Sequence, residues 1–240
     1  MRPRRSHTFK LFGKTESATA ALLEDLSPDP RLQVAYRAHF PEIQITLHVD
    51  EADPAVGRDL LHSLAADVRH RLGPIVYTED PSIGFPDAIA QVMARHPASP
   101  TVALAESCTG GLIGKMITEV PGVSAWFLEG LTTYSNAAKT RLLGVDSALL
   151  AEHGAVSEAV VRAMAEGVRR RSGARIGLAT TGIAGPGGGS PDKPVGTVYI
   201  AMATPAKTTH RLLQLPFDRE RNRVVTAWAA LEQLRRWALS

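Results

Sequence analysis

Residues 102–111 read Val-Ala-Leu-Ala-Glu-Ser-Cys-Thr-Gly-Gly, an apolar run that leads into a glycine-rich turn. A helical pattern continues from the turn to residue 119, so the stretch predicts a strand, a turn and a helix. The hydroxyl of Ser107 would lie on the turn, at the N-terminus of the helix. Three backbone N–H groups after Ser107 are expected to be unpaired, and with the helix dipole they would favour an anion. They belong to Thr109, Gly110 and Gly111.

From about residue 81 onward, strands and helices alternate along the chain. Near-continuous apolar strands in such an alternation indicate a three-layer α/β domain over residues 81–240. The last two strands follow one another directly, so the sheet is expected to be mostly parallel or mixed. Strands are predicted at 101–105, 127–134, 175–181, 195–203 and 208–215, and helices at 84–95, 109–119, 136–143, 157–172 and 218–238.

Residues 1–80 predict a smaller α+β unit. Apolar residues alternate with polar ones on both sides of Pro41, which is typical of a β-hairpin. Asp53-Pro54 is a helix start signal, and Gly73-Pro74 is a stop signal. The predicted order is a helix over 15–26 capped by Thr15, the hairpin, a second helix and a strand over 75–77.

Composition indicates an ordinary globular protein. The chain has 240 residues, of which 44% are hydrophobic, and a mean hydropathy of -0.05. No stretch approaches the ~18 uninterrupted apolar residues of a membrane span, and the basic Met1-Arg2-Pro3-Arg4-Arg5 precedes no apolar signal core. Cys108 is the single cysteine, in agreement with a reducing compartment. We therefore expect a cytoplasmic protein with no membrane partner.

The charge pattern gives no sign of direct nucleic-acid binding. The net charge is +3, from 27 Lys and Arg against 24 Asp and Glu. No long basic run occurs, and Arg169-Arg170-Arg171 closes a predicted helix, where cations complement the dipole.

Lys139 is the best candidate for a base that would activate Ser107. An ordinary lysine has a pKa of ~10.4, and a drop of ~3 units, worth roughly 4 kcal/mol, is needed for a base at neutral pH. Arg141 or apolar surroundings could lower the pKa of Lys139. A solvated lysine on a helix is the ordinary alternative. Cys108 is an alternative nucleophile, although a small packed cysteine is the expected role.

A second loop, Thr180 to Gly189, offers further groups to a ligand. Its Thr-Thr-Gly start lies at a predicted strand end, where backbone donors can face a site. It is not a dinucleotide fingerprint, because a strand follows it rather than a helix. Arg219 and Arg223 share a helix face and could clamp a phosphate, or could instead pair with Asp218 and Glu220.

The sequence contains no convincing metal or nucleotide motif. The eight histidines include no pair at metal-ligand spacing, so no metal is expected. Gly13-Lys14-Thr15 does not complete a P-loop, because that motif needs a glycine where Thr8 stands. No local pattern supports a Ser-His-Asp triad. Together, the nucleophile, base and anion cradle indicate hydrolysis of a small phosphorylated molecule.

Six sequence blocks together resemble the C-terminal domain of the CinA competence/damage-inducible family, over about residues 81–240. Residues 1–80 resemble the KH-like connecting domain that precedes it in longer members. The blocks are Ala105 to Gly111, Pro121-Gly122-x-Ser124, Tyr134-Ser135-Asn136-x-x-Lys139, His153 to Ser157, Thr181 to Pro186 and Pro194 to Tyr199.

The resemblance implies an amidase that converts nicotinamide mononucleotide to nicotinate mononucleotide and ammonia, without a cofactor. It implies that Ser107 is the nucleophile and Lys139 its base, with Tyr134 and Thr181 as polar partners. It also implies a homodimer. The substrate-binding residues expected from the motifs are Thr109, Gly110, Gly111, Asn136, Gly182, Arg219 and Arg223.

Two further expectations concern what family members do elsewhere. The large molybdopterin-binding-like domain of longer members does not occur in this sequence, so its activities, such as ADP-ribose pyrophosphatase, are not expected. The connector lacks a Gly-x-x-Gly loop, so RNA binding is not expected either. The alternatives to the amidase are a non-catalytic binding protein linked to competence or DNA damage, and hydrolysis of another phosphorylated amide or nucleotide.

Overall fold

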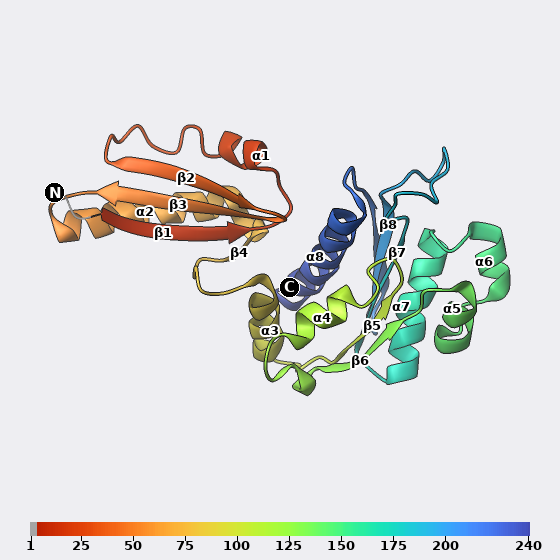
Figure 1. Cartoon of the computed structure of the whole chain (residues 1–240). Helices are drawn as coiled ribbons and strands as arrows, with labels where there is room; N and C mark the ends of the chain where they lie inside the picture. Colours follow the sequence, from red (N-terminus) through yellow and green to blue (C-terminus); the bar gives the residue numbers. More distant parts are fainter. Residues whose placement is uncertain (1–3) are drawn as a thin grey trace. The chain divides into compact units, whose positions relative to one another are not determined.

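The computed structural model describes residues 4–240, so Met1-Arg2-Pro3 of the basic N-terminal stretch lies outside the described residues. The chain divides into two compact units between Ala88 and Ile89 (Figure 1). The sequence-based division after residue 80 falls in the segment that precedes the helix containing this boundary. Among residues 4–240, no helix has both the length and the apolar character needed to cross a membrane.

The first unit is an antiparallel sheet with strand order β2-β3-β1-β4 and one long helix, α2, that packs on it (Figure 1). Its core includes Phe9, Ile45, Leu47 and Val68, all fully buried. The elements are β1 (Arg4–Leu11), α1 (Glu16–Ala21), β2 (Leu32–His39), β3 (Glu42–Asp50), α2 (Pro54–Leu72), η1 (Gly73–Ile75) and β4 (Val76–Thr78).

Local signals set most of these bounds. The predicted hairpin is confirmed, since β2 pairs with β3 in antiparallel register across the turn at Pro41. The Asp53 side chain caps α2 by accepting the N–H groups of Ala55 and Val56. Gly73, with φ 55°, follows the last residue of α2, as its stop signal predicts.

Two predictions for the first unit are wrong. Strand β1 was not expected, because its apolar residues gather at one end of a segment that starts with basic ones. The first helix, capped by Thr15 as predicted, ends at Ala21 instead of Leu26. The N–H of Leu23 bonds to a carbonyl three residues earlier, so the chain tightens into turns there.

The second unit is a three-layer α/β domain around a mixed sheet, as predicted. The strand order is β6-β5-β7-β8-β9, with β5 parallel to β6 and β7, and β8 antiparallel to β7 and β9. Helix α7 packs on one face and α4 and α8 on the other (Figure 1). Helices α5 and α6 pack on α7. In the parallel part of the sheet, all residues of β5 and all but the last of β7 are buried, whereas alternate residues of β6 are exposed.

The described elements of the second unit follow the predicted ones closely, except for α6 and the short η2, which the sequence does not predict. Helix α6 has only seven residues and is capped by Asp146. The elements are α3 (Phe85–Arg95), which carries the boundary between the units, β5 (Val102–Glu106), α4 (Leu112–Thr118), η2 (Val123–Ala125), β6 (Phe127–Thr132), α5 (Asn136–Leu143), α6 (Ser147–His153), α7 (Glu158–Ser172), β7 (Ile176–Gly182), β8 (Thr197–Ala203), β9 (Thr208–Gln214) and α8 (Arg219–Ala238).

Candidate active site

Ser107 lies on the turn between β5 and α4, as the sequence predicts. Its N–H donates to the carbonyl of Thr180 on neighbouring β7 at 3.1 Å, so the turn continues the pairing of the two strands. Gly110 and Gly111 then have φ of 61° and 92°. Two successive residues in this region explain the glycine pair, because other side chains are strained there.

The predicted anion cradle on this turn is wrong for its glycine N–H groups. The Gly111 N–H donates to the carboxylate of Glu106 at 3.0 Å, and the Gly110 N–H donates to the Ser107 carbonyl at 3.1 Å. Thr109 is fully buried, and its hydroxyl shares a hydrogen bond with that of Thr180 at 2.9 Å. Of the glycine N–H groups expected to be unpaired, one is therefore taken by the Glu106 side chain and the other by the backbone of the turn.

Lys139 is buried beside Ser107. Its side chain is only 1% exposed, and Nζ lies 3.1 Å from Oγ of Ser107. Nζ also donates to the carbonyls of Thr133 and Tyr134, at 2.9 and 3.3 Å. Burial disfavours the ammonium form and lowers the pKa of Lys139, which the Cys108 thiolate would partly oppose. The alternative of a solvated lysine is therefore wrong.

The start of α5 brings Lys139 to this position. Ser135 caps the helix by accepting the N–H of Ala138, and Lys139 follows one turn into the helix. Its face also carries the buried Leu143, four residues later. Arg141 is exposed and does not contribute to the lowered pKa of Lys139. Of the two causes that the sequence suggested, burial therefore lowers this pKa and a cationic neighbour does not.

Cys108 does not have the properties of a nucleophile. It is 6% exposed, and burial raises the pKa of its thiol to about 12. A protonated thiol at neutral pH is a poor nucleophile. The packed role expected for Cys108 fits this environment better.

The Ser107–Lys139 pair opens into a cavity of about 200 Å³ inside the second unit. Its walls come from the ends of β5 and β7, from the segments after β6 and before α7, and from the start of α8. Its lining residues are Ser107, Cys108, Tyr134, Lys139, Ala155, Val156, Thr181, Gly182, Ala184 and Arg219.

Tyr134 and Arg219 meet at this cavity. Tyr134 is 60% exposed, and its hydroxyl accepts a hydrogen bond from Arg219 at 3.1 Å. Arg219 also donates to the carbonyl of Gly185 at 2.7 Å. The ion pairs among residues 4–240 do not include Arg219, whereas Asp218 pairs with Arg221 at 3.9 Å. The alternative in which Asp218 neutralises Arg219 is therefore wrong.

Thr181 and Gly182 line the cavity from the end of β7. The Thr181 hydroxyl donates to the carbonyl of Ala155 at 2.9 Å and so fixes the wall before α7. Gly182 allows β8 to approach closely, because a Cβ there would lie 2.9 Å from the carbonyl oxygen of Thr197.

Five of the seven expected binding residues do not line this cavity: Thr109, Gly110 and Gly111 on the turn, and Asn136 and Arg223. Arg223 donates to the carbonyl of Thr109 at 2.8 Å and so braces the back of the turn. Asn136 is exposed and lines a separate groove between α5 and α6. Of the two arginines expected to bind a phosphate together, only Arg219 therefore lines the cavity.

Sequence reasoning gave no role to Glu106, Ala155, Val156 or Ala184. The signal for Glu106 was present, because an acidic residue at the end of an otherwise apolar strand needs buried partners, and a helix N-terminus follows it. The other three lie within two of the six sequence blocks, but their apolar side chains carry no chemical group that would have marked them as part of a site.

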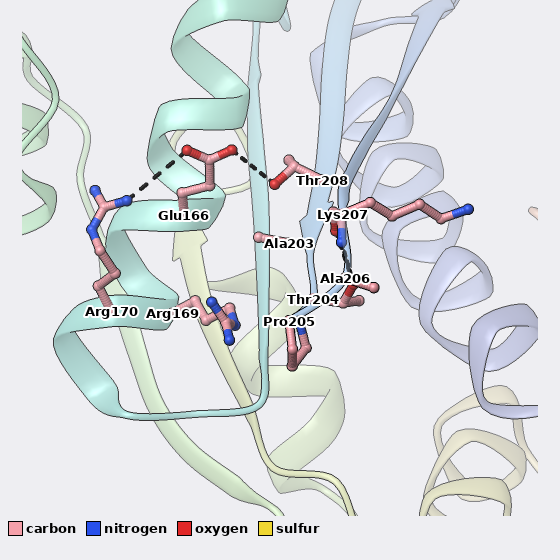
Figure 2. Close-up of a pocket in the computed structure, with 9 residues that line it drawn as sticks. All are labelled: Glu166, Arg169, Arg170, Ala203, Thr204, Pro205, Ala206, Lys207 and Thr208. Atoms are coloured by element: carbon pink, nitrogen blue, oxygen red, sulfur yellow. Dashed lines mark hydrogen bonds and ion pairs between the residues drawn. The ribbon is translucent and has the colours of Figure 1, made fainter.

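A second cavity, of about 290 Å³, lies between α7 and the turn from β8 to β9 (Figure 2). Thr208 donates to Glu166 at 2.8 Å, and Glu166 pairs with Arg170 at 3.9 Å. The Lys207 side chain extends away from these groups (Figure 2). This cavity has no counterpart of the buried serine and lysine. Among residues 4–240, no cluster of three or more His, Cys, Asp or Glu could hold a metal ion.

Family models match both parts of the chain. The model of the CinA C-terminal domain matches residues 88–238, and that of the damage-inducible protein CinA KH domain matches residues 6–78. The chain belongs to the CinA family. This membership confirms the resemblance of the six sequence blocks and of the N-terminal unit.

Relatives with this family name are longer than the present chain. A CinA-like protein of Citrifermentans bemidjiense is 45% identical over 234 residues, which cover 97% of this chain and 55% of that protein. A putative competence-damage inducible protein of Symbiobacterium thermophilum is 43% identical over 98% of this chain and 57% of its own length. The chain thus spans a little over half the length of these curated relatives.

Solved structures of the CinA superfamily share the fold. A competence/damage inducible protein from Agrobacterium tumefaciens is 40% identical, with a TM-score of 0.60, over 63% of this chain and 94% of that one. A CinA superfamily protein from Klebsiella pneumoniae is 31% identical, with a TM-score of 0.61, over 65% of this chain and 96% of that one.

Proposed function

We propose that the second unit hydrolyses the carboxamide of nicotinamide mononucleotide to nicotinate mononucleotide and ammonia. One observation carries the proposal: the buried Nζ of Lys139 lies 3.1 Å from Oγ of Ser107, and both line a cavity. A serine beside a lysine of lowered pKa is a known pattern for nucleophilic catalysis on amides. The choice of substrate comes from the resemblance to the CinA family.

The proposed reaction needs only the serine, the lysine and water. Neutral Lys139 accepts the hydroxyl proton as Oγ of Ser107 attacks the carboxamide carbon. Lys139 then gives that proton to the leaving nitrogen. Ammonia departs, and an ester between the substrate and Ser107 remains. Lys139 next accepts a proton from water as the water attacks the ester, and then returns that proton to Oγ of Ser107 as nicotinate mononucleotide leaves. The pyridinium ring withdraws electrons and makes its carboxamide easier to attack.

The tetrahedral intermediate needs donors for its oxyanion. The Ser107 N–H is already bonded to Thr180, so it is not available. Cys108 follows the nucleophile and lines the cavity, and its N–H has no oxygen acceptor among residues 4–240. We assign this N–H as an oxyanion donor, a role typically worth ~3 kcal/mol.

Arg219 is the proposed site for the phosphate. The N-terminus of α4 is filled by Glu106, and Arg223 lies outside the cavity lining. Arg219 lines the cavity, and its described partners are the Tyr134 hydroxyl and the Gly185 carbonyl, both neutral. Its positive charge is therefore not neutralised by a carboxylate and can attract a phosphate.

The first experiment is ammonia release from nicotinamide mononucleotide by the purified full chain. We expect turnover in the parent and a loss of at least about 10³-fold in Ser107→Ala and Lys139→Ala, because both residues act in the chemical step. Cys108→Ala removes only the thiol and keeps the backbone N–H assigned to the oxyanion, so it is the control for a cysteine nucleophile and should retain activity. Full activity of Ser107→Ala would show that another group is the nucleophile. No turnover by folded parent protein would overturn the proposal in favour of another substrate or a binding role.

The phosphate assignment has its own test. Arg219→Gln should raise KM about 10-fold or more with a smaller effect on kcat, because a charged hydrogen bond to the substrate is lost in the ground state as well. Arg221→Gln, on the same helix and paired with Asp218, is the matched control and should leave KM unchanged. An unchanged KM in Arg219→Gln would contradict the assignment.

A further inference from the structure

We propose that Glu106 is a positioning residue for the nucleophile, which rests on the proposed function of Ser107. The Glu106 side chain is 2% exposed, and both carboxylate oxygens reach over the turn to α4. Oε2 accepts the N–H groups of Gly111 and Ile113 at 3.0 and 3.1 Å, and Oε1 accepts that of Gly114 at 2.9 Å. The carboxylate thus joins the end of β5 to the first turn of α4, with Ser107 between them.

The energetics make this link rigid. A buried carboxylate is strongly destabilised unless hydrogen bonds replace those it made to water. The ion pairs among residues 4–240 do not include Glu106. Its negative charge is stabilised by backbone N–H groups at the positive end of α4 instead of by a cation. Each such charge-assisted bond is stronger than a hydrogen bond between two neutral groups. Movement of the turn would break several of them together.

The link also extends toward the base. The carbonyl of Glu106 accepts the N–H of Thr133 at 2.8 Å, and the carbonyl of Thr133 accepts Nζ of Lys139 at 2.9 Å. The backbone of Glu106 therefore joins the segment that holds Lys139, while its side chain holds the turn that carries Ser107. Glu106 sets the spacing of the pair without touching the reacting atoms.

The same contacts explain why this turn needs an external constraint. Gly110 and Gly111 provide the left-handed conformations that the turn requires, but glycines also leave a chain free to move. The Glu106 carboxylate holds the second of these glycines directly. It also occupies the position where a substrate anion would have met the helix N-terminus.

Glu106→Gln tests the proposal, because the amide keeps the size but has one acceptor oxygen instead of two. The readout is the rate at which a fluorophosphonate labels Ser107 of the full chain, followed by mass spectrometry. Oγ of Ser107 attacks phosphorus, fluoride leaves, and the hydroxyl proton passes to Lys139. We expect labelling about 10- to 100-fold slower, because small misplacement of a nucleophile costs that much.

The pH dependence of labelling separates positioning from electrostatics. Glu106 does not contribute to the lowered pKa of Lys139, so the midpoint of the labelling rate against pH should not move in Glu106→Gln. A shifted midpoint would overturn the positioning role and indicate that the charge of Glu106 acts on the base.

Asp146→Asn is the matched control, because Asp146 caps α6 by accepting the N–H of Ala148. It should label at the parent rate. Glu106→Asp keeps the charge but shortens the side chain, so it should label slowly too, and it carries the test if Glu106→Gln does not fold. A parent-like rate in folded Glu106→Gln or Glu106→Asp would overturn the proposal.

The label reports on Ser107 without the proposed substrate. Labelling of the parent without hydrolysis of nicotinamide mononucleotide would contradict the substrate and leave the comparison for Glu106 valid. Folded parent protein that is not labelled would overturn both the nucleophile and its positioning residue. Ser107→Ala supplies the blank in each case.

Discussion

Lys139 shows how one buried amine can determine the chemistry of the site. A solvated lysine at neutral pH is almost entirely protonated and cannot accept the proton of Ser107. In the second unit, its Nζ is surrounded by carbonyl oxygens and packed side chains with no carboxylate partner in the described residues. Burial disfavours the charge and lowers the pKa, so a larger fraction is neutral.

The pH profile tests this view of Lys139. Because the base must be neutral, kcat/KM should rise with pH through a midpoint below the ordinary lysine value of ~10.4. Lys139→Arg should be inactive at every pH, since a guanidinium stays protonated. The measurement is kcat/KM from pH 5 to 10, with circular dichroism at each pH. A profile that falls as pH rises would contradict the role of Lys139 as base.

At the scale of the elements, α7 holds the site together by lying very close to its neighbours. A Cβ on Gly177 of β7 would lie 2.0 Å from the carbonyl oxygen of Ala165 on α7. A Cβ on Gly167 of α7 would lie 2.1 Å from the carbonyl oxygen of Leu143 on α5. These two glycines let α7 pack between β7 and the helix that carries Lys139.

Gly177→Ala should therefore destabilise the second unit by about 1–3 kcal/mol or more, because the added methyl group forces backbone apart. Chemical denaturation of the full chain, with the transition of the second unit followed separately, measures the effect. Gly187→Ala is the control, since nothing lies within 4 Å of a Cβ there. Equal stability of Gly177→Ala and Gly187→Ala would contradict the close packing.

At the scale of the whole molecule, the two units differ in charge. Residues 1–88 contain 10 Lys and Arg against 13 Asp and Glu, a net charge of −3. Residues 89–240 contain 17 against 11, a net charge of +6. The negative net charge of the first unit, which contains the KH domain, repels a polyanion such as RNA. The positive net charge of the second unit attracts a phosphorylated substrate.

This charge division predicts no specific binding of RNA by the KH unit. Fluorescence anisotropy of the full chain with single-stranded RNA should show at most weak binding, lost when salt is raised from 50 to about 200 mM. The test includes Arg219→Gln, so that RNA attracted to the cavity of the second unit is recognised. Tight binding that persists in Arg219→Gln at the higher salt would contradict the prediction.

Prediction succeeded where the signal is local. Asp53 caps α2 and Gly73 follows its last residue, as their signals predict, because a cap depends on a few neighbouring residues. It failed at β1, α6 and the end of α1, where the segments are short or their apolar pattern is weak. The β1 strand forms because β3 and β4 pair with it, and this pairing cannot be predicted from the residues of β1 alone.

The sequence by itself determined the alternation of strands and helices and the motifs that carry Ser107 and Lys139, since periodicity and caps act over short distances. The tertiary structure decided the chemistry. Ser107 and Lys139 are 32 positions apart and meet because β5, β6 and α5 pack in one order. Burial then lowers the pKa of Lys139, and the side chain of Glu106 takes the Gly111 N–H, which the sequence left open. Burial and competition for donors depend on neighbours from distant parts of the chain, so only the folded molecule fixes them.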